Sequence, residues 1–88
     1  MRKAELKVAS PWGMHARLAF EFAKKSEGFR SSVTVKNESG SGDGKEVMDV
    51  LALATGPGEV ITVEIEGEDE NVAIETLSRL VQVDSSSF

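Results

Sequence analysis

The sequence has no cysteine and no tyrosine, and only one histidine and one tryptophan among its 88 residues. Without thiols the chain can form neither disulfide bonds nor thiolate metal sites, and one histidine is too few for a typical zinc site. We therefore expect no metal and no cofactor. The lack of cysteine also fits a reducing compartment, so we expect a cytoplasmic protein.

Long apolar runs are missing as well. No segment comes close to the run of about 20 apolar residues that a helix needs to cross a bilayer. The first ten residues, MRKAELKVAS, have no signal-peptide core. We expect no membrane insertion, and a chain of 88 residues is the size of one small domain, residues 1–88.

Positive charge is scarce: ten Lys and Arg face fifteen Asp and Glu, for a net charge of −5. The basic residues form no long cluster, so nucleic acid is not expected as a partner. They are nevertheless concentrated in the first 30 residues, which hold seven of them against three glutamates. This part of the chain could present a basic patch to an anion or an acidic protein surface.

Three segments alternate polar and apolar residues with a period of two, the pattern of a half-buried strand. These segments are residues 3–8, 32–36 and 60–66. Between the second and third lies NESGSGDG (37–44), whose turn chemistry predicts a loose hairpin with at most one short extra strand. The tail DSSSF (84–88) is expected to fray.

Three other segments carry apolar residues at helical spacing and predict helices over 16–27, within 47–54 and after Asp69, a good N-cap residue. Gly28 is the expected C′ residue of the first helix. The apolar stripes comprise Ala16, Ala19, Phe20 and Ala23, joined by Leu18 and Phe22, in the first helix and Val72, Ala73, Leu77, Leu80 and Val81 in the last. An antiparallel sheet with the helices on one face would bury these stripes, which predicts a two-layer α+β domain.

The only histidine lies in the stretch SPWGMHARLAF (10–20), directly before the first predicted helix. Pro and Gly mark a turn, which places His15 at the helix N-cap and Ala16 and Arg17 in the first turn. A helix N-terminus offers N–H donors and partial positive charge, so it suits a phosphate group. Histidine is not a favoured cap, and a nucleophilic imidazole would explain its presence there. The Ala16 and Arg17 N–H groups and the Arg17 guanidinium would then stabilise the phosphoryl oxygens.

Other interpretations of His15 remain open at this point. His-x-Arg alone is a weak pattern, and a single histidine near a helix start is more often an ordinary surface residue. A Ser-His-Asp hydrolase is disfavoured because the chain is small and contains no Gly-x-Ser-x-Gly elbow.

A family resemblance goes further than these patterns. The segment GMHARLAF (13–20) resembles the active-site segment of HPr, the histidine-containing phosphocarrier of the bacterial phosphoenolpyruvate:sugar phosphotransferase system. KEVMDVLAL (45–53) is similar to the second-helix segment of that family, and GPGEVITVEIEGEDENVAIETL (56–77) to its last loop, strand and helix. The resemblance covers nearly the whole chain and implies an open-faced sandwich of order βαββαβα, with a four-stranded antiparallel sheet and three helices on one face.

The resemblance also implies a function. His15 matches the histidine that the family phosphorylates at Nδ1, and Arg17 matches the arginine that assists transfer. Enzyme I would donate the phosphoryl group and an EIIA-type protein would receive it. The protein would be a phosphocarrier and not an enzyme, and we expect a monomer. Its partner-binding surface would consist of Phe20, Val47, Met48 and Leu51, whereas Val50 and Leu53 are expected in the core.

Four residues depart from the family pattern. Glu46 stands where many members have a regulatory serine, so regulation by serine phosphorylation is not expected; a glutamate in the first turn of a helix is also simply favoured by the helix dipole. Leu18 replaces the usual Pro and would add exposed apolar surface, and Asp49 replaces a common Gly. Trp12 could line the binding surface or shield the imidazole. Leu18, Trp12 and Asp49 sustain one alternative: an HPr-like regulatory module that binds partners with little or no phosphotransfer.

Overall fold

The computed structural model describes residues 1–83, so the predicted frayed tail lies outside the described residues. Seven elements follow one another along the chain. They are β1 (Arg2–Lys7), α1 (Ala16–Glu27), β2 (Ser32–Asn37), β3 (Gly40–Asp43), α2 (Val47–Ala52), β4 (Val60–Glu66) and α3 (Glu70–Gln82). The predicted order is confirmed, including a short third strand inside the glycine-rich stretch.

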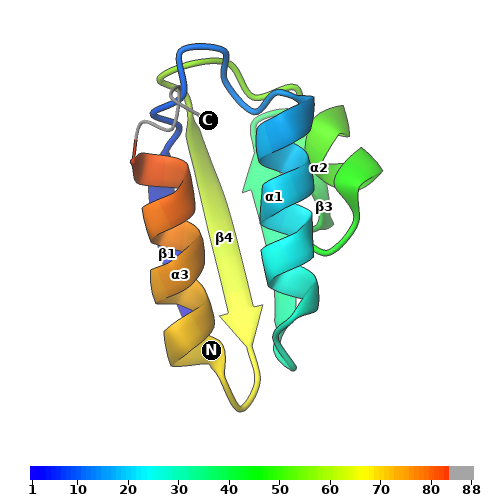
Figure 1. Cartoon of the computed structure of the whole chain (residues 1–88), viewed down its shortest axis with the longest axis vertical. Coiled ribbons are helices and arrows are strands. Elements are labelled where there is room, and N and C mark those ends of the chain that lie inside the picture. The colour runs from blue at the N-terminus through cyan, green and yellow to red at the C-terminus, as the bar shows by residue number, and fades with distance from the viewer. Residues whose placement is uncertain (84–88) are drawn as a thin grey trace.

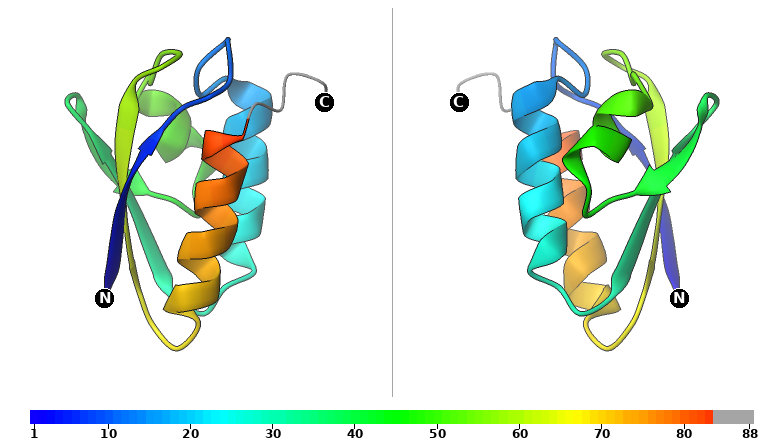
Figure 2. Two further views of the ribbon diagram at one scale, coloured as in Figure 1. Left: turned by 90° about the vertical axis from the view of Figure 1, so that its left-hand side faces the viewer. Right: turned by 90° about the vertical axis from the view of Figure 1, so that its right-hand side faces the viewer.

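The four strands form one antiparallel sheet in the order β1-β4-β2-β3. Strand β4 lies in the middle, so that Val63 pairs with Ala4 on one side and with Val35 on the other. The helices cover one face of this sheet and leave the other open (Figures 1 and 2). The fold is therefore the predicted α+β open-faced sandwich.

The two sheet faces differ because the strands alternate. Ile61, Val63 and Ile65 of β4 are fully buried toward the helices. The opposite face is polar, and Glu64 there pairs with Lys3 at 4.0 Å and Lys36 at 3.1 Å. Such exposed ion pairs contribute little stability, so the apolar layer on the helix side holds the domain together.

Helix α1 has the predicted bounds, but its buried face is rotated from the predicted one. Its buried residues are Leu18, Ala19, Phe22, Ala23 and Ser26. Ala16 and Phe20, which were predicted in the stripe, are exposed. The prediction that Leu18 adds exposed apolar surface is wrong, because only 2% of Leu18 is exposed. Leu18 is instead part of the core beneath α1.

The C-terminal cap of α1 and the buried face of α3 differ from the predictions. Gly28 is the C-cap of α1 with φ −72°, an ordinary right-handed conformation that does not require glycine. In α3, Val72 is 60% exposed, and Ile74 takes its place among the buried residues Ala73, Leu77 and Val81.

None of the helices within residues 1–83 has the length and apolar character needed to cross a bilayer.

Candidate functional site

His15 occupies the N-cap of α1, as predicted. Its backbone is extended (φ −75°, ψ 173°), and its Nδ1 atom accepts a hydrogen bond of 3.4 Å from the Leu18 N–H. This distance is long for such a bond, so the imidazole holds its cap weakly. The side chain is half-buried, and the first turn of α1 contains no acidic residue. The positive end of the helix dipole at His15 therefore has no carboxylate in that turn to offset it.

The loop before His15 is fixed by a second loop, residues 53–58, which runs beside it in Figure 1. The Met14 N–H donates to the Thr55 carbonyl at 2.9 Å. Gly13 has φ +68°, and a Cβ atom there would lie 2.5 Å from the Thr55 carbonyl oxygen. Only glycine tolerates both this conformation and this approach, so Gly13 determines where His15 begins the helix.

Asn37, at the end of β2, holds the loop of residues 53–58 through its side-chain amide. Its Nδ2 donates to the Leu53 carbonyl at 2.8 Å and to the Thr55 hydroxyl at 3.0 Å. Ala54, between these two acceptors, has φ +50°, an unusual conformation for a residue with a side chain. Asn37 and Thr55 were not predicted from the sequence. The only signal nearby is the Gly-Pro-Gly turn that follows Thr55, which does not reveal a contact with Met14.

Ala16 and Arg17 are the first two residues of α1, and both side chains are exposed. Their N–H groups belong to the turn in which a helix lacks its own acceptors. Arg17 adds a guanidinium beside the imidazole in sequence, so backbone and side-chain donors start from the same helix end. This arrangement is suited to holding an anionic group next to His15.

Trp12 packs against the imidazole. The two ring centroids lie 6.0 Å apart with an interplanar angle of 83°, an edge-on arrangement. The indole is 65% exposed. Trp12 therefore flanks the histidine, and it leaves most of its own surface open to solvent or to a partner.

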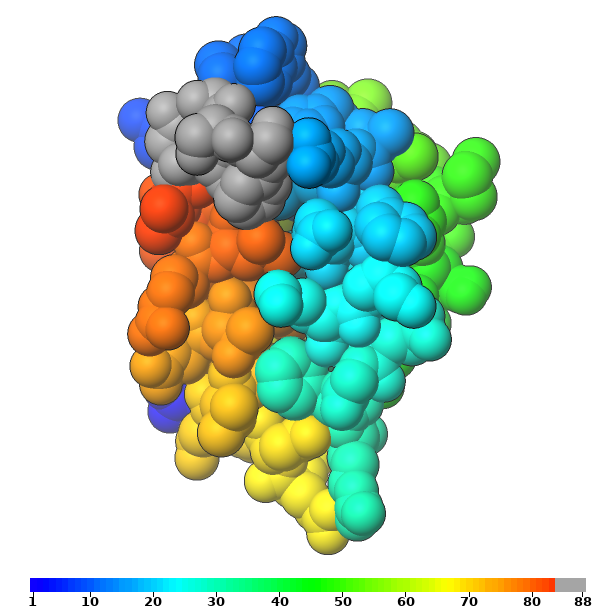
Figure 3. All heavy atoms as spheres, viewed as in Figure 1, coloured from blue at the N-terminus to red at the C-terminus, as the bar shows by residue number. Residues whose placement is uncertain are grey.

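The four predicted partner-binding residues lie on two neighbouring helices, α1 and α2 (Figure 1). Phe20 is 49% and Met48 is 74% exposed. Val47 and Leu51 are partly buried and pack on the core, while Val50 and Leu53 are buried in it as predicted. Helices α1 and α3 form the surface seen in Figure 3, and the loop before α1 projects from one end of it. Exposed apolar side chains thus lie on both of these neighbouring helices.

The start of α2 is acidic. Glu46 is its N-cap residue and makes no side-chain capping bond, and Asp49 is the acidic residue of the first turn. The Asp49 carboxylate accepts the Asp43 N–H at 3.0 Å and so ties α2 to β3. Asp49 therefore has a structural role between these two elements.

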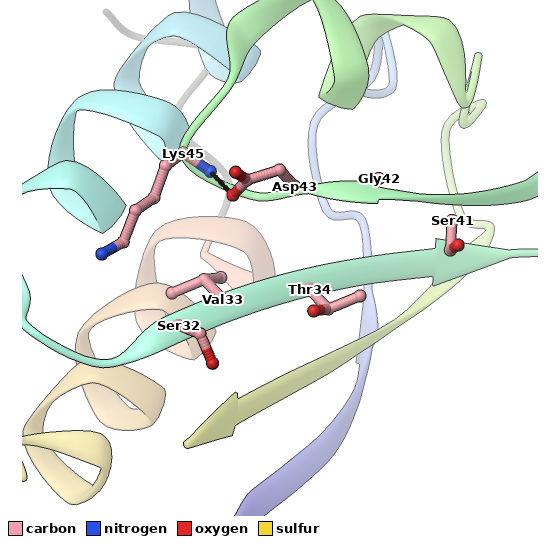
Figure 4. Close-up of a pocket in the computed structure, with 7 residues that line it drawn as sticks. All are labelled: Ser32, Val33, Thr34, Ser41, Gly42, Asp43 and Lys45. Atoms are coloured by element: carbon pink, nitrogen blue, oxygen red, sulfur yellow. Dashed lines mark hydrogen bonds between the residues drawn. The ribbon is translucent and has the colours of Figure 1, made fainter. Parts of the chain in front are cut away.

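A hollow of about 530 Å³ lies along β2 and β3 (Figure 4). Its lining comprises Ser32, Val33, Thr34, Ser41, Gly42, Asp43 and Lys45. Lys45 Nζ turns out of it to donate to the Phe29 carbonyl at 2.9 Å. None of the predicted site residues lines this hollow, so it has no part in the chemistry at His15.

The N-terminus of α3 is built in a different way. Asp69 is the N-cap residue, but its side chain makes no capping bond. Its carboxylate accepts the Ser31 hydroxyl, the Ser31 N–H at 3.0 Å and the Arg30 N–H at 2.9 Å. The bond from the Ser31 hydroxyl, followed by that from the Arg30 N–H, lowers the pKa of Asp69 to about 2. We call Arg30, Ser31 and Asp69 the Asp69 clasp. The clasp joins the segment between α1 and β2 to the start of α3.

Comparison with known proteins places this architecture in one family. Residues 2–83 match the family model of the PTS HPr component phosphorylation site. The phosphocarrier protein HPr of Xylella fastidiosa (strain Temecula1) is 35% identical over 82 residues, which cover 93% of this chain and 92% of that protein.

Solved structures agree. The phosphocarrier protein HPr from Bacillus anthracis superposes with a TM-score of 0.88 at 28% identity, covering 92% of this chain and 96% of that one. An HPr dimer from Thermoanaerobacter tengcongensis superposes with a TM-score of 0.71 at 28% identity, covering 92% and 93%. The chain therefore belongs to the HPr family, whose members are phosphocarriers of the bacterial phosphotransferase system and not enzymes.

Proposed function

We propose that this phosphocarrier accepts its phosphoryl group on His15, receives it from Enzyme I and passes it to an EIIA-type protein. The observation that carries the proposal is the position of the chain's only histidine at the N-cap of α1, where Nδ1 accepts the Leu18 N–H of the first turn. Membership of the HPr family supports Enzyme I and an EIIA-type protein as the partners.

The transfer can be written with these groups. The Nδ1 lone pair gives up the 3.4 Å bond from the Leu18 N–H and attacks the phosphorus atom, and the bond between phosphorus and the donor breaks. The oxygens then lie at the helix start, where the Ala16 and Arg17 N–H groups and the Arg17 guanidinium stabilise them. Onward transfer reverses these steps, with a nucleophile of the acceptor attacking the same phosphorus.

The partners would dock on the apolar surface formed by Phe20, Val47, Met48 and Leu51. The exposure of Phe20 and Met48 beside the His15 helix supports this assignment. Methionine and aromatic side chains adapt to different surfaces, as a carrier with two successive partners requires. We further propose that the protein works in the cytoplasm as a monomer. Size-exclusion chromatography with light scattering would test the monomer, because the T. tengcongensis HPr is also found as a dimer.

The test of the carrier is an intact-mass time course with phosphoenolpyruvate, magnesium and Enzyme I from the same organism. We expect one acid-labile phosphoryl group on the wild type and none on a folded His15→Ala variant. An acid-labile group on His15→Ala would refute the assignment, since the chain has no second histidine.

The second candidate is a regulatory binding module with little or no phosphotransfer, and the indole that crowds His15 favours it. It would be supported by an unphosphorylated wild type in the presence of an Enzyme I that is active on another HPr.

A further inference from the structure

We propose that Trp12 is a positioning residue of the phosphotransfer site: its indole restricts the rotation of the His15 imidazole and screens the phosphohistidine from water. The inference rests on the proposed phosphorylation of His15. It starts from the edge-on contact between the two rings, whose centroids lie 6.0 Å apart. This separation and angle are in the range that aromatic pairs prefer.

The backbone of Trp12 is held in place on both sides. Its N–H donates to the hydroxyl of Ser10 at 3.3 Å, and Ser10 is buried. The next residue, Gly13, donates to the Ser10 carbonyl at 3.0 Å and lies against Thr55. Pro11 fixes one further backbone angle of this turn. The indole is therefore presented to His15 by an anchored turn.

The fold makes little use of this side chain. Trp12 is 65% exposed and does not belong to the core cluster, whereas its neighbour Met14 is 5% exposed and does. Burial of apolar surface is the usual reason to hold a tryptophan in place, and here most of that surface stays in water. The contact with His15 is what distinguishes this position.

The imidazole needs a second support. Its single hydrogen bond at Nδ1 is 3.4 Å long, and this bond must be given up when the phosphoryl group arrives. The ring contact is separate from the Nδ1 hydrogen bond, so it need not be given up when the phosphoryl group arrives. The contact should therefore lengthen the lifetime of the phosphorylated state.

The test is the hydrolysis of the purified phosphoprotein in the absence of Enzyme I and EIIA, which removes docking from the measurement. We expect Trp12→Ala to hydrolyse about two- to tenfold faster than the wild type and Trp12→Phe to restore most of the lifetime. Val72→Ala is the matched control, because it also removes an exposed apolar side chain, on α3, and should leave the lifetime unchanged. Equal lifetimes of Trp12→Ala and the wild type would overturn the proposal. So would a defect confined to the KM for Enzyme I, which would make Trp12 a docking residue.

A second readout does not depend on phosphorylation. Trp12 is the only tryptophan, so the tryptophan emission of the protein comes from this position alone. The emission of the wild type should differ from that of His15→Ala, and an emission insensitive to His15 would also overturn the proposal. A wild type that never becomes phosphorylated, but whose emission follows His15, would refute the proposed function and leave the ring contact established.

Discussion

The molecule has two helix N-termini whose cap residues are used in opposite ways. At α1, the His15 side chain makes one long hydrogen bond within its own helix. At α3, the Asp69 side chain makes no bond to its own helix and three to Arg30 and Ser31, which lie before β2. The first cap leaves its side chain half-buried at the helix start, whereas the second uses both carboxylate oxygens to hold the fold.

The comparison indicates that the N-terminus of α1 serves the chemistry of the domain and the N-terminus of α3 serves its stability. An imidazole is a poor cap, and a carboxylate with three donors is a strong acceptor. The positive end of α1 is thus left for an anion that arrives from outside. The equivalent end of α3 lies at the opposite end of the molecule (Figure 1), where the chain supplies its own anion for the clasp. Five predictions can break or sharpen this contrast.

The largest effect is expected from Gly13→Ala. The added Cβ would meet the Thr55 carbonyl at 2.5 Å with the backbone at φ +68°. We expect a loss of about 2–4 kcal/mol in the free energy of unfolding and a slower phosphorylation of His15. Chemical denaturation and the phosphorylation time course would measure the two effects.

Gly28→Ala is the control for this substitution. Gly28 has φ −72°, and its added Cβ would meet no atom closer than 3.4 Å. We expect this variant to be as stable as the wild type or slightly more stable. Equal stability of the Gly13 and Gly28 variants would mean that the close approach to Thr55 does not hold the His15 loop.

Arg17→Ala should affect transfer and not folding. Removing a donor that stabilises the phosphoryl oxygens should slow phosphorylation about ten- to a hundredfold, with a smaller change in affinity for Enzyme I. Arg17→Lys should recover part of the rate, since it keeps the charge but loses the planar donors. Stopped-flow transfer between the purified proteins would measure it, and unchanged rates would remove Arg17 from the site.

Asp69→Asn should affect folding and not transfer. The amide nitrogen cannot accept from Arg30 or Ser31, so at least one N–H of the clasp loses its acceptor. We expect the Tm to fall by several degrees while His15 is phosphorylated at the normal rate. Glu68→Gln is the control, because Glu68 contacts only the exposed Arg30 side chain at 3.1 Å and should matter little. A transfer defect in Asp69→Asn would show that the two helix ends are coupled.

The clasp also predicts a pH dependence. The pKa of Asp69 is lowered from 3.8 to about 2 in the fold, so the folded state favours the ionised carboxylate. Its stabilisation is complete above the unfolded value near 4 and is lost as the pH falls from there toward 2. The Tm difference between wild type and Asp69→Asn should shrink over this interval. A difference that stays constant down to pH 2 would contradict the assignment.

The smallest effect on stability is expected from His15→Ser. Serine is a better N-cap than histidine, so the free energy of unfolding should rise by about 0.5 kcal/mol while phosphorylation is lost. Thermal denaturation and intact-mass analysis would test both. A clear loss of stability would mean that the imidazole supports the fold more than its long hydrogen bond indicates.

The sequence was sufficient for the element order and for the cap position of His15, but not for the face of α1. Residues 16–23 are apolar at six of eight positions, so hydrophobicity alone selects no single stripe. Packing against the sheet determines which face of α1 is buried: Leu18 and Phe22 point into the core, and Phe20 points outward. A pattern predicts a buried face only where polar residues mark the opposite face.

The supports of the site could not be predicted for a different reason. Met14 and Thr55 are linked through backbone atoms, which carry no sequence signal. Asn37 reaches the Thr55 loop only because β2 and the end of α2 meet in the fold. The sequence thus indicates the reactive group, while the structure is needed to identify what holds it.

The central place of β4 has a consequence for synthesis of the protein. Strands β1 and β2 are not paired with each other; each is paired with β4, which comes later in the chain. A growing chain that has left the ribosome as far as α2 therefore has no partner for β1. The sheet can close only after Glu66 has emerged, so β1 and β2 must wait for the synthesis of β4 before they are joined in one sheet.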